Sequence, residues 1–417
     1  LRADLAQTIA DLRPRFVRFP GGCLVHGDGV DNMYRWKNTV GPPEQRKGQR
    51  NTELPPAAGL GYFEYFQFCE DIGAVPVPVV PAAVSCQNSS DGGQKGLPQE
   101  EMDDYLQEIL DLIEYANGTP STPWGKVRAE AGHPAPFNLK YIGIGNEERI
   151  SDLFEENFTY LYKAVREKHP EITVIGTAGP FSSGTDYEEG WKIAEKLGIE
   201  VMDEHYYQPP GWFIHNQDFY DKYPRNRSKV YLGEYASWGN TLNNALAEAA
   251  YMTALERNGD VVLMASYAPL LAKEKHTQWS TDLIFFNNTE IKPTVNYQVQ
   301  KLFSLNSGDE YLTNTLETNI KDEAVRKRMA VSVVRDSKTG DVVLKIVNLL
   351  PVPAVTSVNM ENSGEMKRQI RSVFIGFQPD VILENAPLKN TGIFGKQTKQ
   401  QPDQVNFQSM AGVSNFL

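Results

Sequence analysis

The chain of 417 residues is poor in cysteine, with only Cys23, Cys69 and Cys86. An odd and low number gives no disulfide framework, and the three are too far apart to form a zinc-ligand motif. Runs of apolar residues are also short, and none approaches the roughly 20 residues of a membrane-spanning helix. We therefore expect no metal, no cofactor and no membrane span. The chain opens inside a helical pattern, so the lack of a visible signal peptide carries little weight.

Positive charge is scarce as well, because 53 Asp and Glu outnumber 41 Lys and Arg and leave a net charge of -12. Nucleic acids and anionic membrane surfaces both require a basic face, so neither is an expected partner. A neutral substrate such as a sugar is compatible with this charge. The 41% hydrophobic and 23% charged residues are ordinary for a globular protein, and the length predicts one large domain with a smaller one.

The first three quarters of the sequence alternates nearly continuous apolar runs with amphipathic helical patterns, as parallel strands covered by helices do. Strands are predicted at residues 16–20, 75–80, 141–145, 173–176, 201–207, 229–235 and 261–267. From the third onward they begin about 30 residues apart, the length of one βα unit. This cadence predicts a (β/α)8 TIM barrel. The alternative, a doubly wound open sheet, would normally show a Gly-rich phosphate turn after an early strand, and none is present.

Only seven strands can be counted, and a helix at residues 1–12 precedes the first of them. We therefore expect the first barrel strand to lie upstream of residue 1, and the strands at 16–20 and 261–267 to have unpaired edges. The catalytic barrel would then occupy residues 1–308 without its first strand. On this count we expect the 417-residue chain to have little activity by itself.

After residue 308 the pattern becomes antiparallel, with strands at 328–335 and 341–349 around a turn and further pieces at 357–360 and 369–376. Residues 309–417 are predicted to form a C-terminal antiparallel β-sandwich, which the chain does not necessarily complete. The last twenty or so residues are polar and poorly patterned, and we assign them no element.

Two acidic residues stand out by position. Glu147 ends the strand Tyr-Ile-Gly-Ile-Gly-Asn-Glu, and Glu234 ends the strand Val-Tyr-Leu-Gly-Glu-Tyr. The C-terminal strand ends form the active-site face of a barrel, and these two strands lie three βα units apart. Two carboxylates that face one bond are the minimum apparatus for glycoside hydrolysis. Either glutamate alone would more readily be read as an exposed strand-end residue.

Polar neighbours of these glutamates are further candidates. Asn146 could donate a hydrogen bond to a sugar hydroxyl, although a turn role is equally compatible. Strand alternation places Asp203, His205 and Tyr207 on one face, where a phenol and an imidazole could set the protonation of the carboxylates. A structural role for His205 stays open.

Three other side chains complete the set from the residues alone. Arg18, on the first visible strand, needs an acidic partner inside a barrel, and a nucleophilic carboxylate is a fitting one. Trp238 and Trp279 follow the last two barrel strands. Each could form a wall of a sugar subsite or simply pack.

Six segments resemble glycoside hydrolase family 51, the α-L-arabinofuranosidases, and in particular its plant and Bacteroides-like branch. They are RFVRFPGGCLVHG, YIGIGNEE, MDEHYY, KVYLGEYASWGN, MASYAPLL and VNYQVQKLFSLNSGD. The combination of GNE on one strand and GEYA on the other is the most specific part. The resemblance implies removal of terminal α-L-arabinofuranosyl groups from arabinoxylan, arabinan or their oligosaccharides, with retained configuration.

The resemblance also implies roles. Glu147 would be the general acid/base, Glu234 the nucleophile and Arg18 its support, with Asn146 and Tyr207 at the sugar. Many family members have Asn where this chain has Cys23, which changes one sugar contact. They also carry a substrate-contacting glutamate on the strand expected upstream. Secretion or a periplasmic location fits such a substrate, and a homo-oligomer is left open.

Two other functions compete with this interpretation. Another retaining glycosidase of the same clan, such as an endo-xylanase or endoglucanase, shares the two glutamates. A non-catalytic carbohydrate-binding protein on a degraded barrel is the third reading, although the presence of Glu147 and Glu234 argues against it.

The cysteines give a geometric prediction. Cys23 and Cys86 follow neighbouring strands, which lie about 4.8 Å apart, so their thiols should approach each other near the sugar site. We expect their Cα atoms within roughly 7 Å, the limit for a disulfide. Cys69 lies on a helical pattern with Phe63 and Phe66 and should be buried and unreactive.

Overall fold

The computed structural model describes residues 1–27, 29–47, 59–88 and 93–359, together with four later strands within residues 372–416. The chain divides into two compact units. The first contains residues 1–206, 226–234 and 263–266, and the second contains 207–225, 235–262 and 267–417.

Seven strands form one sheet in the order of the sequence, with β1 and β7 at its two ends. The pairs from β1 through β5 are parallel. The strands are β1 (Phe16–Phe19), β2 (Val75–Val80), β3 (Tyr141–Ile144), β4 (Thr173–Thr177), β5 (Val201–Gln208), β6 (Lys229–Ser237) and β7 (Val262–Tyr267).

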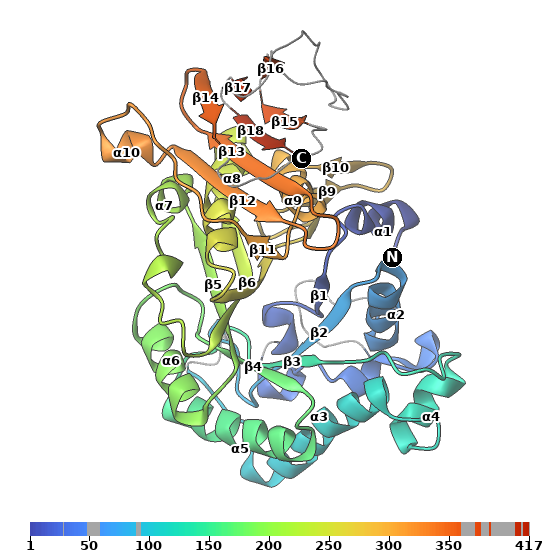
Figure 1. Cartoon of the computed structure of the whole chain (residues 1–417). Coiled ribbons are helices and arrows are strands. Elements are labelled where there is room, and N and C mark those ends of the chain that lie inside the picture. The colour runs from blue at the N-terminus through green and yellow to red at the C-terminus, as the bar shows by residue number, and fades with distance from the viewer. Residues whose placement is uncertain are drawn as a thin grey trace. The chain divides into compact units, whose positions relative to one another are not determined.

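Helices alternate with these strands along the chain (Figure 1). In the first unit they are α1 (Ala3–Ala10), α2 (Tyr62–Ile72), α3 (Met102–Asn117), α4 (Pro123–Glu130), α5 (Asp152–Lys168) and α6 (Thr185–Leu197). Helix α2 packs on β1 and β2, whereas α5 and α6 both pack on β4. Helix α5 begins where the Ser151 hydroxyl accepts a hydrogen bond from the Phe154 amide at 3.2 Å, as an N-cap does.

Every strand of the sheet contributes one side chain to a single apolar cluster. Its members are Phe16, Val77, Tyr141, Ile175, Val201, Tyr231 and Met264, one from each of β1 to β7 in turn. Side chains from all strands can meet only if the sheet curls around them, which is how the interior of a TIM barrel is packed. The predicted (β/α)8-type fold with seven visible strands is therefore confirmed, and no doubly wound sheet is formed.

Among the described residues, the second unit combines helices with two antiparallel sheets and one mixed sheet. Its helices are α7 (Pro210–His215), α8 (Leu242–Arg257), α9 (Val295–Leu305) and α10 (Glu323–Arg326). One sheet has the order β11 (Glu310–Tyr311), β12 (Met329–Arg335), β13 (Val342–Asn348), β18 (Gly412–Phe416) and β15 (Ser372–Gly376). Another joins β14 (Ala354–Val358), β17 (Val405–Ser409) and β16 (Leu383–Glu384), and a third joins β10 (Ile291–Pro293), β9 (Ile284–Phe286) and β8 (Leu271–Lys273).

The predicted hairpin is confirmed, because β12 and β13 pair antiparallel along their full lengths. Helix α8 packs against both strands. The domain boundary at residue 308 stays a prediction. Our assignment of no element to the last twenty residues was wrong, since β17 and β18 lie there. Both strands are short and mostly polar, so their apolar alternation is too weak to detect.

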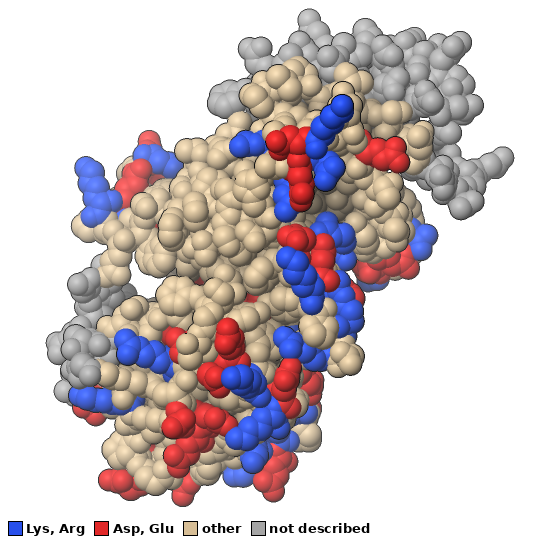
Figure 2. Space-filling view, turned by 90° about the vertical axis from the view of Figure 1, so that its left-hand side faces the viewer, with Lys and Arg blue, Asp and Glu red and all other residues tan. Residues whose placement is uncertain are grey.

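Short 3₁₀ helices occupy several loops. They are η1 (Cys23–Val25), η2 (Val30–Asn32), η3 (Trp36–Thr39), η4 (Pro43–Gln45), η5 (Gln99–Glu101) and η6 (Tyr220–Lys222). On the face drawn in Figure 2, basic and acidic side chains are interspersed and form no broad basic patch. Among the described residues, no helix combines the length and apolar character that crossing a membrane requires.

Gly233 gives a test of how closely the side chain of Asp203, on β5, packs against the backbone of β6. A Cβ atom added there would lie 2.0 Å from Oδ1 of Asp203. Gly233→Ala should therefore lower the free energy of unfolding by about 2–3 kcal/mol through overpacking, measured by urea denaturation. Gly211→Ala is the matched control, because its Cβ would meet nothing within 4 Å. Equal stability of Gly233→Ala and the wild type would contradict the close approach.

Candidate active site

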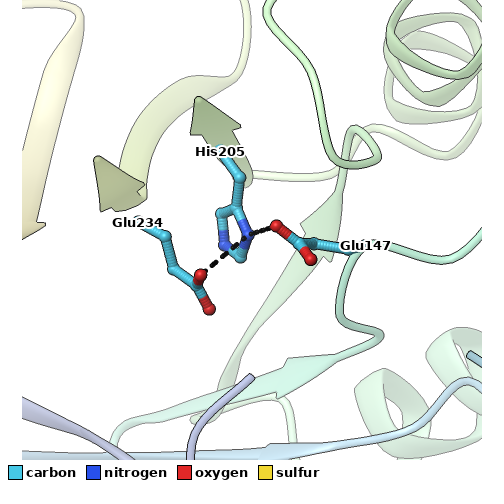
Figure 3. A group of neighbouring side chains, drawn as sticks. All are labelled: Glu147, His205 and Glu234. Atoms are coloured by element: carbon cyan, nitrogen blue, oxygen red, sulfur yellow. Dashed lines mark hydrogen bonds and ion pairs between the residues drawn. The ribbon is translucent and has the colours of Figure 1, made fainter. Parts of the chain in front are cut away.

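Glu147 lies in the turn that follows β3 (Figure 3). The turn contains two residues with left-handed backbone, Gly145 at a φ of 102° and Glu147 itself at 56°. Left-handed backbone is uncommon for a residue with a side chain and tends to occur at functional sites. It turns the Glu147 carboxylate toward His205, whose Nδ1 lies 2.8 Å from Oε1.

Glu234 lies on β6 and is paired with a buried cation. Nη1 of Arg18, on β1, donates a hydrogen bond to Oε1 of Glu234 at 2.7 Å. Both side chains are about nine-tenths buried, so little water screens the attraction. Nη2 of Arg18 also lies 3.8 Å from Oδ2 of Asp203. The arginine that the sequence placed beside the nucleophile is thus in contact with Glu234.

His205, on β5, lies between the two glutamates (Figure 3). Its Nδ1 is 2.8 Å from Oε1 of Glu147 and 3.8 Å from Oε2 of Glu234, and its Nε2 is 3.0 Å from Oδ2 of Asp203. Burial lowers the pKa of His205, but the charges of Asp203 and Glu234 and hydrogen bonds to Asp203 and Glu147 raise it to about 10. The ring is therefore an imidazolium at neutral pH, and it donates to the carboxylates from both nitrogens.

One ligand atom from each of Glu147, His205 and Glu234 lies within 4.8 Å of the other two. One nitrogen and two carboxylate oxygens could hold a divalent cation. A cation would have to displace the proton of His205, because a histidine binds a metal only when its nitrogen is free. With Arg18 also beside Glu234, the arrangement fits a pair of catalytic carboxylates better than a metal centre.

Asn146 is fully buried beside the arginine. Its Oδ1 accepts a hydrogen bond from Nη2 of Arg18. Its Nδ2 has no hydrogen-bond partner among the described residues. An amide whose two N–H donors are both unused has the chemistry to bind a hydroxyl.

Two side chains from neighbouring loops contact the other oxygen of Glu147. Nε2 of Gln87 donates to Oε2 at 3.2 Å, and Sγ of Cys23 lies 3.9 Å from the same atom. Cys23 was predicted at the site, whereas Gln87 was not. Gln87 follows β2 in a loop without a pattern, and only its closeness to Cys86 in the sequence could have drawn attention to it.

Cys23 and Cys86 are both free, and each thiol shifts the pKa of the other, so the two lie close together. The expected Cα separation stays a prediction. The Cys23 thiol and the neighbouring His26 outweigh burial and lower the pKa of Cys86 to about 5. Cys69 is buried as predicted, and burial raises its pKa to about 12.

The three aromatic candidates belong to the second unit. The ring of Tyr207 lies 4.7 Å from that of Trp279, and the two planes are tilted by 44°. Trp238 and Trp279 are 57% and 44% exposed, so neither serves only to fill a core. Their contact with a sugar stays a prediction.

The sequence analysis missed two buried residues behind the site. Glu148 and His26 are both fully buried, and Nε2 of His26 lies 2.9 Å from Oε1 of Glu148. The available signal was Glu148 itself, the second glutamate of the run Asn-Glu-Glu. A turn that faces solvent does not need two adjacent glutamates.

Comparison with known proteins identifies relatives along the whole chain. The model of the α-L-arabinofuranosidase 1 domain matches residues 8–225, and that of the α-L-arabinofuranosidase C-terminal domain matches residues 233–415. An extracellular exo-α-L-arabinofuranosidase of Streptomyces chartreusis is 48% identical over 332 residues, which are 76% of this chain and 40% of that protein. α-L-Arabinofuranosidase 1 of Arabidopsis thaliana is 33% identical over 97% of this chain and 56% of its own length.

Among solved structures, an arabinose-bound family 51 α-L-arabinofuranosidase superposes with a TM-score of 0.80 and 28% identity. The match covers 100% of this chain and 66% of that one. The chain thus spans roughly half the length of the curated relatives that it matches.

The charge on His205 predicts a pH dependence of stability. Its folded pKa of about 10 lies above the ordinary value of about 6.5. The stabilisation by the imidazolium is therefore complete below about pH 6.5 and is lost as the pH rises through about 10. The difference in free energy of unfolding between wild type and His205→Gln should shrink by more than about 1 kcal/mol from pH 6 to pH 10 in urea denaturation.

His169→Gln is the control, because the contact of His169 with Glu171 is largely exposed. A difference between wild type and His205→Gln that stays constant with pH would show that His205 is not held as an imidazolium.

Proposed function

Because the chain belongs to the α-L-arabinofuranosidases of glycoside hydrolase family 51, we propose that it is the catalytic part of an enzyme that hydrolyses terminal α-L-arabinofuranosyl groups with retention of configuration. The substrates would be arabinoxylan, arabinan or their oligosaccharides. The observation that carries the proposal is the pair of carboxylates that both approach Nδ1 of His205. Arg18 contacts Glu234, whereas His205 is the one basic side chain in contact with Glu147 among the described residues.

The separation of the two carboxylates supports retention over inversion. An oxygen of Glu147 and an oxygen of Glu234 lie within 4.8 Å of each other. Retaining glycosidases place their carboxyl groups about 5–5.5 Å apart, whereas inverting enzymes leave about 6.5–9.5 Å for a water molecule. The shorter spacing allows direct attack by one carboxylate on the sugar.

In the first step, Glu234 attacks the anomeric carbon while Glu147 gives its proton to the departing glycosidic oxygen. The bond to the aglycone breaks, and an ester forms between the sugar and Glu234. In the second step, Glu147 removes a proton from water, the resulting hydroxide adds to the anomeric carbon, and Glu234 departs as a carboxylate. Arg18 stabilises the ionised form of Glu234.

The remaining predicted site residues would bind the sugar. Asn146 offers its unused Nδ2 donor to a hydroxyl next to the anomeric carbon, and Cys23 lies beside the acid/base. Tyr207, Trp238 and Trp279 supply aromatic faces for sugar rings. The Streptomyces relative is named as extracellular, and a polymeric substrate also favours action outside the cytoplasm.

An aryl substrate pair separates this function from the competing ones. Release of arabinose from an aryl α-L-arabinofuranoside, without cleavage of an aryl xylobioside, is expected. The reverse preference would point to an endo-xylanase of the same clan. Sugar binding without turnover of either substrate would point to a carbohydrate-binding protein.

Substitution of the two glutamates should give different kinetic signatures. Glu234→Ala should lower kcat by more than about 10⁴-fold on every substrate, because no covalent intermediate forms. Glu147→Ala should lower kcat on arabinoxylan by about 10²–10⁴-fold. It should spare the first step on activated aryl arabinofuranosides, and azide should accelerate the second step by attacking the glycosyl-enzyme in place of water, which gives an α-L-arabinofuranosyl azide.

Release of arabinose and aryl alcohol by chromatography and spectroscopy provides the measurement. Glu204→Gln serves as control, because Glu204 is a fully buried carboxylate that accepts a hydrogen bond from Nε1 of Trp191, and strand alternation directs it to the face opposite Asp203 and His205. Unchanged activity of Glu147→Ala on arabinoxylan would refute the assigned role.

A further inference from the structure

We propose that Glu148, together with His26, is a positioning residue that holds Asn146 and the acid/base Glu147 in their working geometry. The inference rests on the proposed function for the role of Glu147. Glu148 is fully buried and both of its carboxylate oxygens contact protein groups, so any effect on the reaction passes through its neighbours.

The Glu148 carboxylate joins the loops after three adjacent strands. Its Oε2 accepts a hydrogen bond from the backbone amide of Asn146 at 2.5 Å. Its Oε1 accepts one from the amide of Ala82 at 3.2 Å, in the loop after β2. The same oxygen lies 2.9 Å from Nε2 of His26, which follows η1 in the loop after β1.

Each of these loops also carries a side chain at the Glu147 carboxylate or next to it. Cys23 is in the first loop, Gln87 in the second and Asn146 in the third. One buried carboxylate therefore ties together the segments that surround Glu147. Because these contacts come from different strands, displacement of Glu148 would alter all of them together.

The pair is enclosed by protein. His26 is fully buried, and although burial lowers its pKa, its charge interaction and hydrogen bond with Glu148 raise it to about 9. A buried carboxylate paired with a buried imidazolium loses much of its favourable energy when either partner is neutralised. Both partners are therefore needed to keep this buried pair stable.

The turn around Glu148 requires such a support. Glu147 has the left-handed φ of 56°, a conformation that persists only where surrounding contacts enforce it. A Cβ added to Gly145 would lie 2.9 Å from Oε2 of Glu148 and 2.7 Å from Cγ2 of Thr177. The backbone of the turn thus packs closely around the Glu148 carboxylate. This carboxylate accepts a hydrogen bond from the backbone amide of Asn146, the residue before Glu147.

The first experiment separates positioning from general destabilisation. The kcat/KM values of wild type, Glu148→Gln and Glu204→Gln are measured on aryl α-L-arabinofuranosides whose leaving groups span a wide range of pKa. A misplaced acid matters most for poor leaving groups. Glu148→Gln should therefore lower kcat/KM about 10–100-fold on the poorest leaving group and less than about threefold on the most activated one. Glu204→Gln should retain the wild-type dependence.

His26→Gln gives a second variant that keeps the carboxylate. It should steepen the dependence of kcat/KM on the leaving group in the same direction. The double variant should have a kcat/KM within about threefold of that of Glu148→Gln, because both substitutions act through one contact. An equal loss on all substrates, or full additivity of the two substitutions, would overturn the proposal while leaving the proposed function intact.

Hydrogen exchange supplies a readout that does not depend on turnover. Peptides covering residues 141–150 should exchange faster in Glu148→Gln and His26→Gln than in wild type, because the Asn146 amide loses its acceptor, and unchanged protection there would overturn the positioning role. In Glu204→Gln they should exchange as in wild type. If the enzyme that contains this chain fails to cleave any arabinofuranoside, the proposed function fails, and the exchange data still decide whether Glu148 fixes the turn.

Discussion

The site depends on a balance of charge in a space with little water. Two cations, Arg18 and His205, are enclosed with three carboxylates, those of Glu147, Asp203 and Glu234. Without the cations, three neighbouring carboxylates could not all remain ionised after burial. The two cations leave these five side chains with one excess negative charge, which a single added proton neutralises. A single proton shared by two carboxylates is what a retaining glycosidase needs before its first step, so the electrostatics of the barrel end and the proposed chemistry have the same requirement.

Much of the barrel could be predicted because buried parallel strands leave a direct trace in the sequence. Each predicted strand lies within about two residues of the observed one, and β2 coincides with its prediction at Val75–Val80. Glu147 and Glu234 could be found for a related reason. A charged residue that terminates an apolar run stands out, and the geometry of a barrel brings strand ends together.

The contacts made by loops could not be predicted in the same way. Gln87, His26 and Glu148 meet around Glu147 from three separate connections. Loop paths follow no period, so their spatial neighbours cannot be read from spacing. Strands β8 to β10 were missed for a different reason, since each has three residues, too few for an alternation to be recognised.

The left-handed turn at residues 145–148 has a consequence for how this sequence can change in length. Glu147 and Glu148 are adjacent, yet one carboxylate meets His205 and the other meets His26. Loss or gain of a single residue here would shift the two glutamates by one position. Glu147 would move away from His205, and Glu148 would lose its three partners. Most surface loops of a barrel tolerate insertions and deletions. This tetrapeptide should instead behave as a fixed-length segment, so that variation in its neighbourhood is confined to side chains.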